Sequence, residues 1–188
     1  MDDDIYLNLQ RLHQIIDKNR DPQLLLGVIF CNRMPVRDPT NKWYTSFEMY
    51  KDQRYPPYLQ GGAYLMTRQT ALLIWNKALI TPLLHQEDVF ITGILPKLFG
   101  LQPKGSSTFY STSSSSYWGR RYARVPDCKL AYYTSFRGLK SNQIIDLYEK
   151  NLKGAPCPIT KLPDYDTCET LNNNDAPYKV ISYKRVKH

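Results

Sequence analysis

Hydrophobic residues along the chain follow two spacings, one typical of helices and one typical of strands. Leucine and isoleucine recur at helical spacing over residues 9–16, which predicts a short helix that ends near residues 19–22. The continuous apolar run 24–30 has the length of a strand and predicts a buried one. Residues 43–50 are interpreted as a strand or a short helix, and residues 61–66 as a short strand.

The middle of the chain predicts two helices. Thr67 is a candidate N-cap for a helix that runs from Arg68 to about Leu79. A second helix is expected to begin at Glu87 and to be disturbed at Pro96, because proline lacks the backbone donor that a helix interior needs.

The last third of the chain has weaker patterns. Residues 105–116 are rich in serine and threonine and are predicted to form a surface loop. Apolar residues over 144–152 predict a last helix, and little regular structure is expected after residue 154 until a strand candidate at 178–183. Strands and helices mix throughout, so the fold class is expected to be α/β or α+β.

Composition and charge describe an ordinary globular chain. It has 188 residues, 42% hydrophobic and 22% charged, which suits one domain. The formal net charge is +8, from 25 Lys plus Arg against 17 Asp plus Glu. A basic chain invites a nucleic-acid-binding hypothesis, but no zinc-finger spacing or RNA-binding aromatic motif accompanies the charge, so no nucleic-acid partner is predicted. A solvated basic face, or one that holds an anionic ligand, remains the alternative.

Four cysteines are present, Cys31, Cys128, Cys157 and Cys168, and none has CxxC spacing. A metal cluster built on cysteine is therefore not expected. Disulfides in an oxidising compartment and buried free thiols both remain open. The longest apolar run, 24–31, is far shorter than a membrane-spanning helix requires.

Three acidic residues, Asp2, Asp3 and Asp4, open the chain just before an apolar Ile-Tyr-Leu segment. In an extended chain Asp2 and Asp4 point to the same side. Two carboxylates on one side form a hard-oxygen site for Mg²⁺ or Mn²⁺, which a nucleotide-diphosphate donor needs. The alternative is a solvated acidic segment without a ligand.

A second acidic pair, Glu87 and Asp88, precedes an apolar stretch. Acidic residues are common in a first helical turn because the helix dipole favours them there. A carboxylate beside a cleft can instead act as a general base toward a hydroxyl group.

Residues 55–64 combine two prolines, two glycines and three tyrosines. The small residues allow a ligand to approach the backbone closely, and aromatic faces suit the C–H faces of sugars. A tight structural turn with core tyrosines explains the same residues without a ligand.

Taken in order, four of these segments resemble one family. The segments DDDIYLN, KWYTS, YPPYLQGGAYLMT and EDVFITG are similar to successive motifs of the β-1,3-glycosyltransferases known as galactosyltransferase family 31. The resemblance covers about the first half of the chain, residues 1–98. Each motif alone is common, whereas four in this order are specific.

The resemblance implies a GT-A type fold, an α/β sandwich around a central sheet, and an inverting hexosyltransferase. Such an enzyme moves Gal or GlcNAc from a UDP-sugar to the 3-hydroxyl of a glycan acceptor on a glycoprotein or glycolipid, with Mn²⁺ as cofactor. By position, Asp2, Asp3 and Asp4 bind the donor, and Asp4 with Asp2 binds the metal. Asp88 is expected to be the general base, in an acidic pair with Glu87. The positions that match the family's substrate-binding residues are Trp43, Tyr58, Gly61, Gly62 and Tyr64.

The chain also departs from the family pattern. Ala63 stands where a second glycine is common, and no histidine occurs between Val89 and Lys187 to act as a further metal ligand. The acidic motif stands at the start of the chain, although in the family it follows an N-terminal nucleotide-binding half. We therefore expect an N-terminally truncated GT-A domain: residues 1–153 as its C-terminal part and 154–188 as an irregular extension.

The family further implies a full-length type II protein, anchored in the Golgi membrane by one signal-anchor helix, with a luminal catalytic domain. A non-catalytic carbohydrate-binding relative, or an inactive fragment of such an enzyme, is the alternative to an active transferase.

Overall fold

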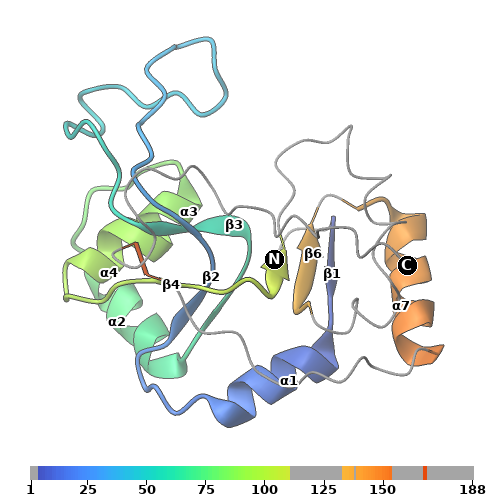
Figure 1. Ribbon diagram of the computed structural model, residues 1–188. Coiled ribbons are helices and arrows are strands. Elements are labelled where there is room, and N and C mark those ends of the chain that lie inside the picture. The colour runs from blue at the N-terminus through green and yellow to red at the C-terminus, as the bar shows by residue number, and fades with distance from the viewer. Residues whose placement is uncertain (1–3, 111–132, 138, 154–166, 169–188) are drawn as a thin grey trace, which may run out of the picture.

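The computed structural model describes residues 4–110, 133–137, 139–153 and 167–168 (Figure 1). Helices and strands mix along the chain, as the sequence predicts. In chain order the elements are β1 (Ile5–Leu7), α1 (Leu9–Lys18), β2 (Leu25–Phe30), β3 (Tyr58–Met66), α2 (Arg68–Ala78), α3 (Glu87–Val89), the π-helical turn η1 (Phe90–Ile94), α4 (Leu95–Lys97), β4 (Lys104–Gly105), β5 (Phe109–Tyr110), β6 (Ser135–Arg137) and α7 (Ser141–Lys153).

The described strands form two three-stranded sheets. One has the order β3-β2-β4, with β2 antiparallel to β3 and parallel to β4. The other has the order β1-β6-β5, in which β6 is antiparallel to β1 and parallel to β5. The helices α2, α3 and α4 lie on the side of the first sheet, and α7 lies against β1 of the second (Figure 1).

The core follows the apolar pattern of the strands. β2 is the central strand of its sheet, and its run Leu25–Phe30 is buried up to the last residue. A strand buried on both faces reads as a continuous hydrophobic run, which explains why this element is predicted correctly. Leu147 of α7 is fully buried with Tyr6, Tyr133 and Phe136 over the second sheet.

Two helices begin at a capping side chain, and one of these caps, Thr67, is predicted from the sequence. Thr67 caps α2: its hydroxyl accepts a 3.3 Å hydrogen bond from the Thr70 N–H. Asn8 caps α1 in the same way, through the N–H of Arg11 at 3.0 Å. The predicted helices at 68–79 and over 144–152 are confirmed within three residues at each end, and the first helix ends at Lys18, just before its predicted end near residues 19–22.

The helix that begins at Glu87 is disturbed before Pro96. Residues Phe90–Ile94 form a π-helical turn, in which the Leu95 N–H donates to the Phe90 carbonyl. Widening the turn here accommodates a proline that cannot donate within a regular ladder. The turn also brings Gly93 against β3: a Cβ atom on Gly93 would lie 2.9 Å from Tyr58 Cβ and 3.2 Å from the Pro57 carbonyl oxygen.

Replacing Gly93 with alanine is expected to lower the free energy of unfolding by about 1–3 kcal/mol, because an added methyl group in a packed interface forces the backbone to shift. Urea unfolding of the variant and the wild type measures the difference. Gln69→Ala, on an exposed position of α2, is the control and should change stability by less than about 0.5 kcal/mol. A stabilised Gly93→Ala variant would contradict the packing argument.

The prediction for residues 43–50 is wrong. They form neither a strand nor a helix: apart from an isolated bridge between Val36 and Tyr44, their backbone bonds are those of turns. The strand predicted at 61–66 is confirmed, and it begins three residues earlier, at Tyr58, because the proline pair ends just before it.

The predicted surface loop at 105–116 is also wrong over its described part. Residues 104–110 contain β4 and β5, and Ser106 and Thr108 are fully buried. Their hydroxyl oxygens lie 2.9 Å apart, and the Thr134 hydroxyl donates to Thr108 at 3.0 Å. Small polar side chains that satisfy one another can be buried, which the composition of this segment does not reveal.

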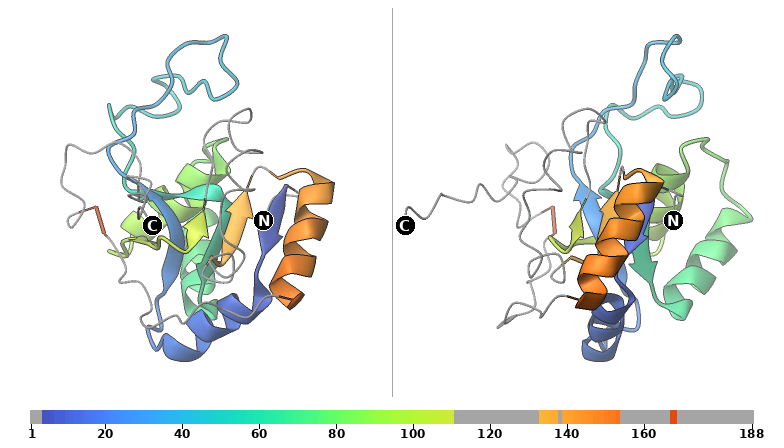
Figure 2. Two further views of the ribbon diagram at one scale, coloured as in Figure 1. Left: turned by 45° about the vertical axis from the view of Figure 1, so that its right-hand side comes forward. Right: turned by 90° about the vertical axis from the view of Figure 1, so that its right-hand side faces the viewer.

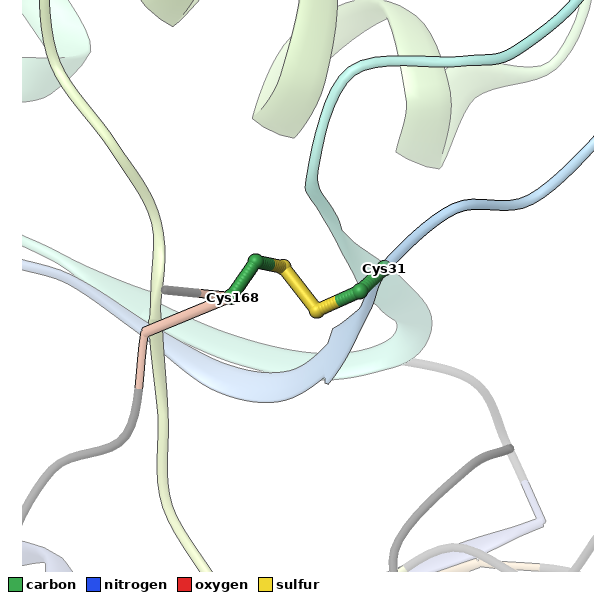
Figure 3. The surroundings of a disulfide bond; sticks show 2 residues. All are labelled: Cys31 and Cys168. Carbon is green, nitrogen blue, oxygen red and sulfur yellow. A yellow bond between two sulfur atoms is a disulfide. The ribbon is translucent and has the colours of Figure 1, made fainter. Parts of the chain in front are cut away.

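One disulfide is described, between Cys31 at the end of β2 and Cys168 (Figure 3). Both residues pack against the buried cluster of Leu25, Ile29 and Leu59. Cys128, Cys157, residues 111–116, the strand candidate at 178–183 and nearly all of the predicted extension 154–188 lie outside the described residues. Within the described ranges, no helix combines the length and apolar character needed to cross a membrane.

Candidate functional site

The two adjacent glycines of β3, Gly61 and Gly62, face different sets of side chains. Gly61 faces the acidic pair: a Cβ atom here would lie 3.2 Å from Asp88 Cβ and 3.5 Å from Glu87 Oε2. The Gly61 N–H donates to Asp88 Oδ2 at 3.3 Å. Gly62 faces a different surface, where an added Cβ would lie 2.8 Å from Arg137 Cδ and 3.2 Å from Ile5 Cδ1. Any larger residue at either position would therefore displace a neighbouring side chain.

Asp88 is half-buried at the start of α3, beside β3 (Figure 1). Its Oδ1 accepts the Val89 N–H at 2.8 Å. Burial raises the pKa of Asp88 above its ordinary value of 3.8, and the neighbouring charge of Glu87 adds to the rise, while the N–H groups of Val89 and Gly61 oppose it. A carboxylate with a raised pKa accepts a proton more readily than an exposed one.

Glu87 is exposed, and Tyr64 holds its carboxylate. The Tyr64 hydroxyl donates to Glu87 Oε1 at 2.6 Å. Burial raises the pKa of Tyr64, and the hydrogen bond to Glu87 raises it further, so the phenol keeps its proton at neutral pH. Tyr64 therefore orients one acidic residue of the pair while Gly61 contacts the other.

Thr92 connects the acidic pair to β3 from within the core. Its buried hydroxyl oxygen accepts the Leu59 N–H at 2.8 Å, and the hydroxyl donates to the Asp88 carbonyl. Tyr58 is also buried, with edge-to-face contacts to Phe30 and Tyr55. The structure thus places Tyr58 with the residues that support the site, and its predicted contact with a sugar stays a prediction.

Asp4 is next in the chain to Ile5, one of the residues that Gly62 faces. It directly precedes β1, where Ile5 pairs with Arg137 of β6 and contacts Gly62. The Asp4 carbonyl accepts the Leu139 N–H at 3.0 Å. The Asp4 Oδ1 atom is buried and makes no hydrogen bond with any described residue. A buried carboxylate oxygen without a partner fits a metal ligand, since burial without a partner is costly.

The remaining predicted metal and donor residues, Asp2 and Asp3, lie outside the described residues. In the described part of the chain, no three His, Cys, Asp or Glu side chains gather in a way that could hold a metal ion. Asp4 is thus the one member of the predicted acidic motif that the structure describes, and its unpartnered Oδ1 atom is of the type that binds a cation.

A hydrogen-bond network beside the acidic pair was not predicted. The Tyr55 hydroxyl donates to Gln86 Oε1 at 2.6 Å, and Gln86 Nε2 donates to the Trp43 carbonyl at 2.6 Å. The Thr45 hydroxyl oxygen lies 2.8 Å from the Tyr55 hydroxyl oxygen. The one sequence signal for Gln86 is its place immediately before the acidic pair.

Trp43 is brought to this network by its backbone. The residue is 55% exposed, and Lys42 Nζ lies 4.2 Å from the centroid of its ring. Of the predicted substrate residues, Gly61 and Tyr64 contact the acidic pair directly, Trp43 joins it through Gln86, and Gly62 faces Arg137 and the strand after Asp4.

Comparison with known proteins gives one family. The model of the family described as Galactosyltransferase matches residues 1–106. Beta-1,3-galactosyltransferase 1 of Mus musculus and of Homo sapiens are each 32% identical to the chain over 125 residues, which is 65% of this chain and 36% of those proteins. Beta-1,3-galactosyltransferase 5 of Homo sapiens is 26% identical over 161 residues, which is 84% of this chain and 49% of that protein. The chain therefore spans between a third and a half of the curated relatives that it matches.

Proposed function

The chain belongs to the galactosyltransferase family, as the order of its motifs predicts, and from this premise we propose that the intact protein is an inverting β-1,3-hexosyltransferase of GT-A type. Its donor is a UDP-sugar that carries galactose or N-acetylglucosamine. Its acceptor is the 3-hydroxyl of a glycan on a glycoprotein or glycolipid.

The observation that carries this proposal is the environment of Asp88. A half-buried carboxylate of raised pKa lies directly against a glycine, whose lack of a side chain allows the carboxylate to pack against β3. In the proposed reaction Asp88 accepts the proton of the acceptor 3-hydroxyl. The acceptor oxygen then forms a bond to C1 of the donor sugar as the bond from C1 to UDP breaks, so the anomeric centre inverts.

Asp4, together with Asp2, is proposed to hold Mn²⁺. A divalent cation at this position would neutralise the charge that develops on the leaving diphosphate. The buried, unpartnered Oδ1 of Asp4 supports this assignment. One base is sufficient in such a mechanism, because the leaving group needs no proton when its charge is neutralised.

We also propose that the protein works in the Golgi lumen, as a type II membrane protein. The disulfide between Cys31 and Cys168 supports an oxidising compartment, since structural disulfides persist there and are rare in the cytosol.

Transfer should depend on both a UDP-sugar and a divalent cation. We expect the purified intact protein to release UDP and form a β-1,3-linked product from UDP-Gal or UDP-GlcNAc with Mn²⁺. Chelation with EDTA should abolish turnover, and added Mn²⁺ should restore it. Calorimetry of UDP binding with and without Mn²⁺ measures how donor binding depends on the metal, independently of catalysis. Binding of UDP and glycan without any transfer would instead identify a non-catalytic carbohydrate-binding relative.

Gly61→Ala tests the contact between β3 and the acidic pair. The added methyl group would lie 3.2 Å from Asp88 Cβ, which is tight enough to move the carboxylate by a few tenths of an ångström. We expect kcat to fall about tenfold, since a misplacement of about 1 Å costs about a hundredfold. Steady-state kinetics and the melting temperature of the variant should be measured together. An unchanged kcat in a folded variant would show that Asp88 does not need this position.

A further inference from the structure

The connection between β2 and β3, residues 31–57, projects away from the rest of the described structure (Figures 1 and 2). It begins after Phe30 and returns at Tyr58, and these two residues pair in the β2–β3 ladder. A connection of this length without regular elements is uncommon in a compact domain unless it has a function.

Arg37 holds this connection together. Its guanidinium group donates hydrogen bonds to four backbone carbonyls of the same connection: those of Thr45 at 2.7 Å, Ser46 at 2.8 Å, Tyr50 at 2.8 Å and Asp52 at 3.1 Å. Its Cζ atom also lies 4.0 Å from the ring centroid of Phe47. Bonds from a charged donor are stronger than neutral ones, and the planar guanidinium can satisfy several acceptors at once.

The segment that Arg37 gathers is the one that reaches the acidic pair. Thr45 is fully buried, and while its carbonyl binds Arg37, its hydroxyl oxygen lies next to the Tyr55 hydroxyl. Tyr55 in turn donates to Gln86, the residue immediately before Glu87. Two positions earlier than Thr45, the Trp43 carbonyl accepts from the same Gln86 side chain.

The connection therefore lies on the side of β3 where a base would act on the acceptor. Gln86 belongs to the turn that precedes Asp88, whereas Gly62 faces Arg137 and Ile5, the residue that follows Asp4. Trp43 adds an exposed aromatic ring at the same place. An aromatic face of this kind suits the C–H face of a sugar.

We infer that Arg37 is a positioning residue for the glycan acceptor, an inference that rests on the proposed transferase function. Arg37 joins the backbone of residues 45–52 into one unit, and Gln86 holds the adjoining Trp43 backbone beside the turn that precedes Asp88. Arg37 itself contacts neither substrate. Its loss would leave the donor side intact and would release the platform on which the acceptor sugar rests.

The test compares Arg37→Ala and Arg37→Lys with Arg54→Ala in the intact protein. Arg54 is a matched control in the same connection, because its guanidinium donates to one carbonyl, that of Asn32, at 2.8 Å. We expect Arg37→Ala to raise the KM for the acceptor about 10- to 100-fold, the scale of a misplaced positioning group. The KM for the UDP-sugar and the affinity for UDP should stay within about twofold of the wild type.

Arg37→Lys should recover little of this loss, since an ammonium group cannot bind four carbonyls in a plane. Hydrogen exchange supplies a readout that does not depend on activity. The Thr45 and Tyr50 N–H groups donate to the Val36 and Ser46 carbonyls, and their exchange should accelerate in Arg37→Ala but not in Arg54→Ala.

Three results would overturn the inference: equal effects of Arg37→Ala and Arg54→Ala, a fall in kcat with an unchanged acceptor KM, or unchanged exchange at Thr45 and Tyr50. If Arg37→Ala does not fold, Arg37→Lys is compared with Arg54→Ala in its place. A failure of both Arg37 variants to fold would indicate a purely structural role and would overturn the inference. A wild-type protein without any transfer would overturn the proposed function itself, which is a separate outcome.

Discussion

Asp88→Asn in the intact protein is expected to lower kcat for glycosyl transfer by about a thousandfold. General base catalysis typically contributes about 10²- to 10⁴-fold, and an amide oxygen cannot accept the acceptor proton at neutral pH. Asparagine retains the size of aspartate and one acceptor oxygen, so the 2.8 Å hydrogen bond from the Val89 N–H can be kept, and only the longer one from the Gly61 N–H, at 3.3 Å, is lost. Turnover with UDP-sugar and glycan measures the loss, and calorimetry should show that UDP still binds.

Asp17→Asn is the control for this substitution. Asp17 is an exposed residue of α1 that pairs with His13 one turn earlier, far along the chain from the acidic pair. Its variant should retain the wild-type kcat. Unchanged transfer in Asp88→Asn would refute the assignment of the base.

The pH dependence of the rate and of the stability tests the raised pKa of Asp88 independently. Because burial raises the pKa of Asp88, the acid limb of the rate profile should lie above the ordinary aspartate value of 3.8, and the rate should increase with pH through this limb. The folded state also binds the Asp88 proton more tightly than the unfolded state does. The free energy of unfolding should therefore fall as pH rises from 3.8 through the raised pKa, a contribution that Asp88→Asn should remove.

Cys31→Ser is expected to lower the free energy of unfolding by about 3–5 kcal/mol. The Cys31–Cys168 disulfide joins residues separated by 137 positions, and closing a long loop restricts the unfolded chain strongly. Both half-cystines also pack against the cluster that contains Leu25 and Leu59. Urea unfolding of the oxidised protein, in parallel with the variant, measures the difference.

Cys168→Ser and the double variant should give the same loss as Cys31→Ser, because each removes the same crosslink. A loss below about 1 kcal/mol would mean that this crosslink contributes little to the stability of the fold.

The sequence predicts well those elements that are determined by residues close together in the chain. The apolar run of β2, the Thr67 cap of α2 and the spacing of α1 each need only neighbouring residues to be recognised. The prediction for residues 104–110 is wrong because their burial depends on a distant part of the chain. Ser106 and Thr108 are buried because Thr134, distant in the chain, completes their hydrogen bonds.

The residues of the candidate site also fall into those that the sequence predicts and those that it does not. Asp88, Glu87, Gly61 and Tyr64 are recognised by residue type and order, and the structure brings them into contact. Arg37 and Gln86 are not recognised, because both act on backbone carbonyls. A carbonyl is present at every residue, so its position carries no signal in the sequence, and only the path of residues 31–57 shows which ones converge.

The pairing of β1 with β6 has a consequence for how the protein is made. Strand β1 carries Asp4 at its start, and its partner β6 lies near the other end of the described residues, at Ser135–Arg137. Pairings so distant in sequence form late, since the intervening chain must be ordered first. On the ribosome, β1 cannot pair until β6 has emerged, so the sheet that follows Asp4 is completed only after Arg137 has been synthesised. Nascent chains that end before β6 should consequently lack the ordered surroundings of Asp4.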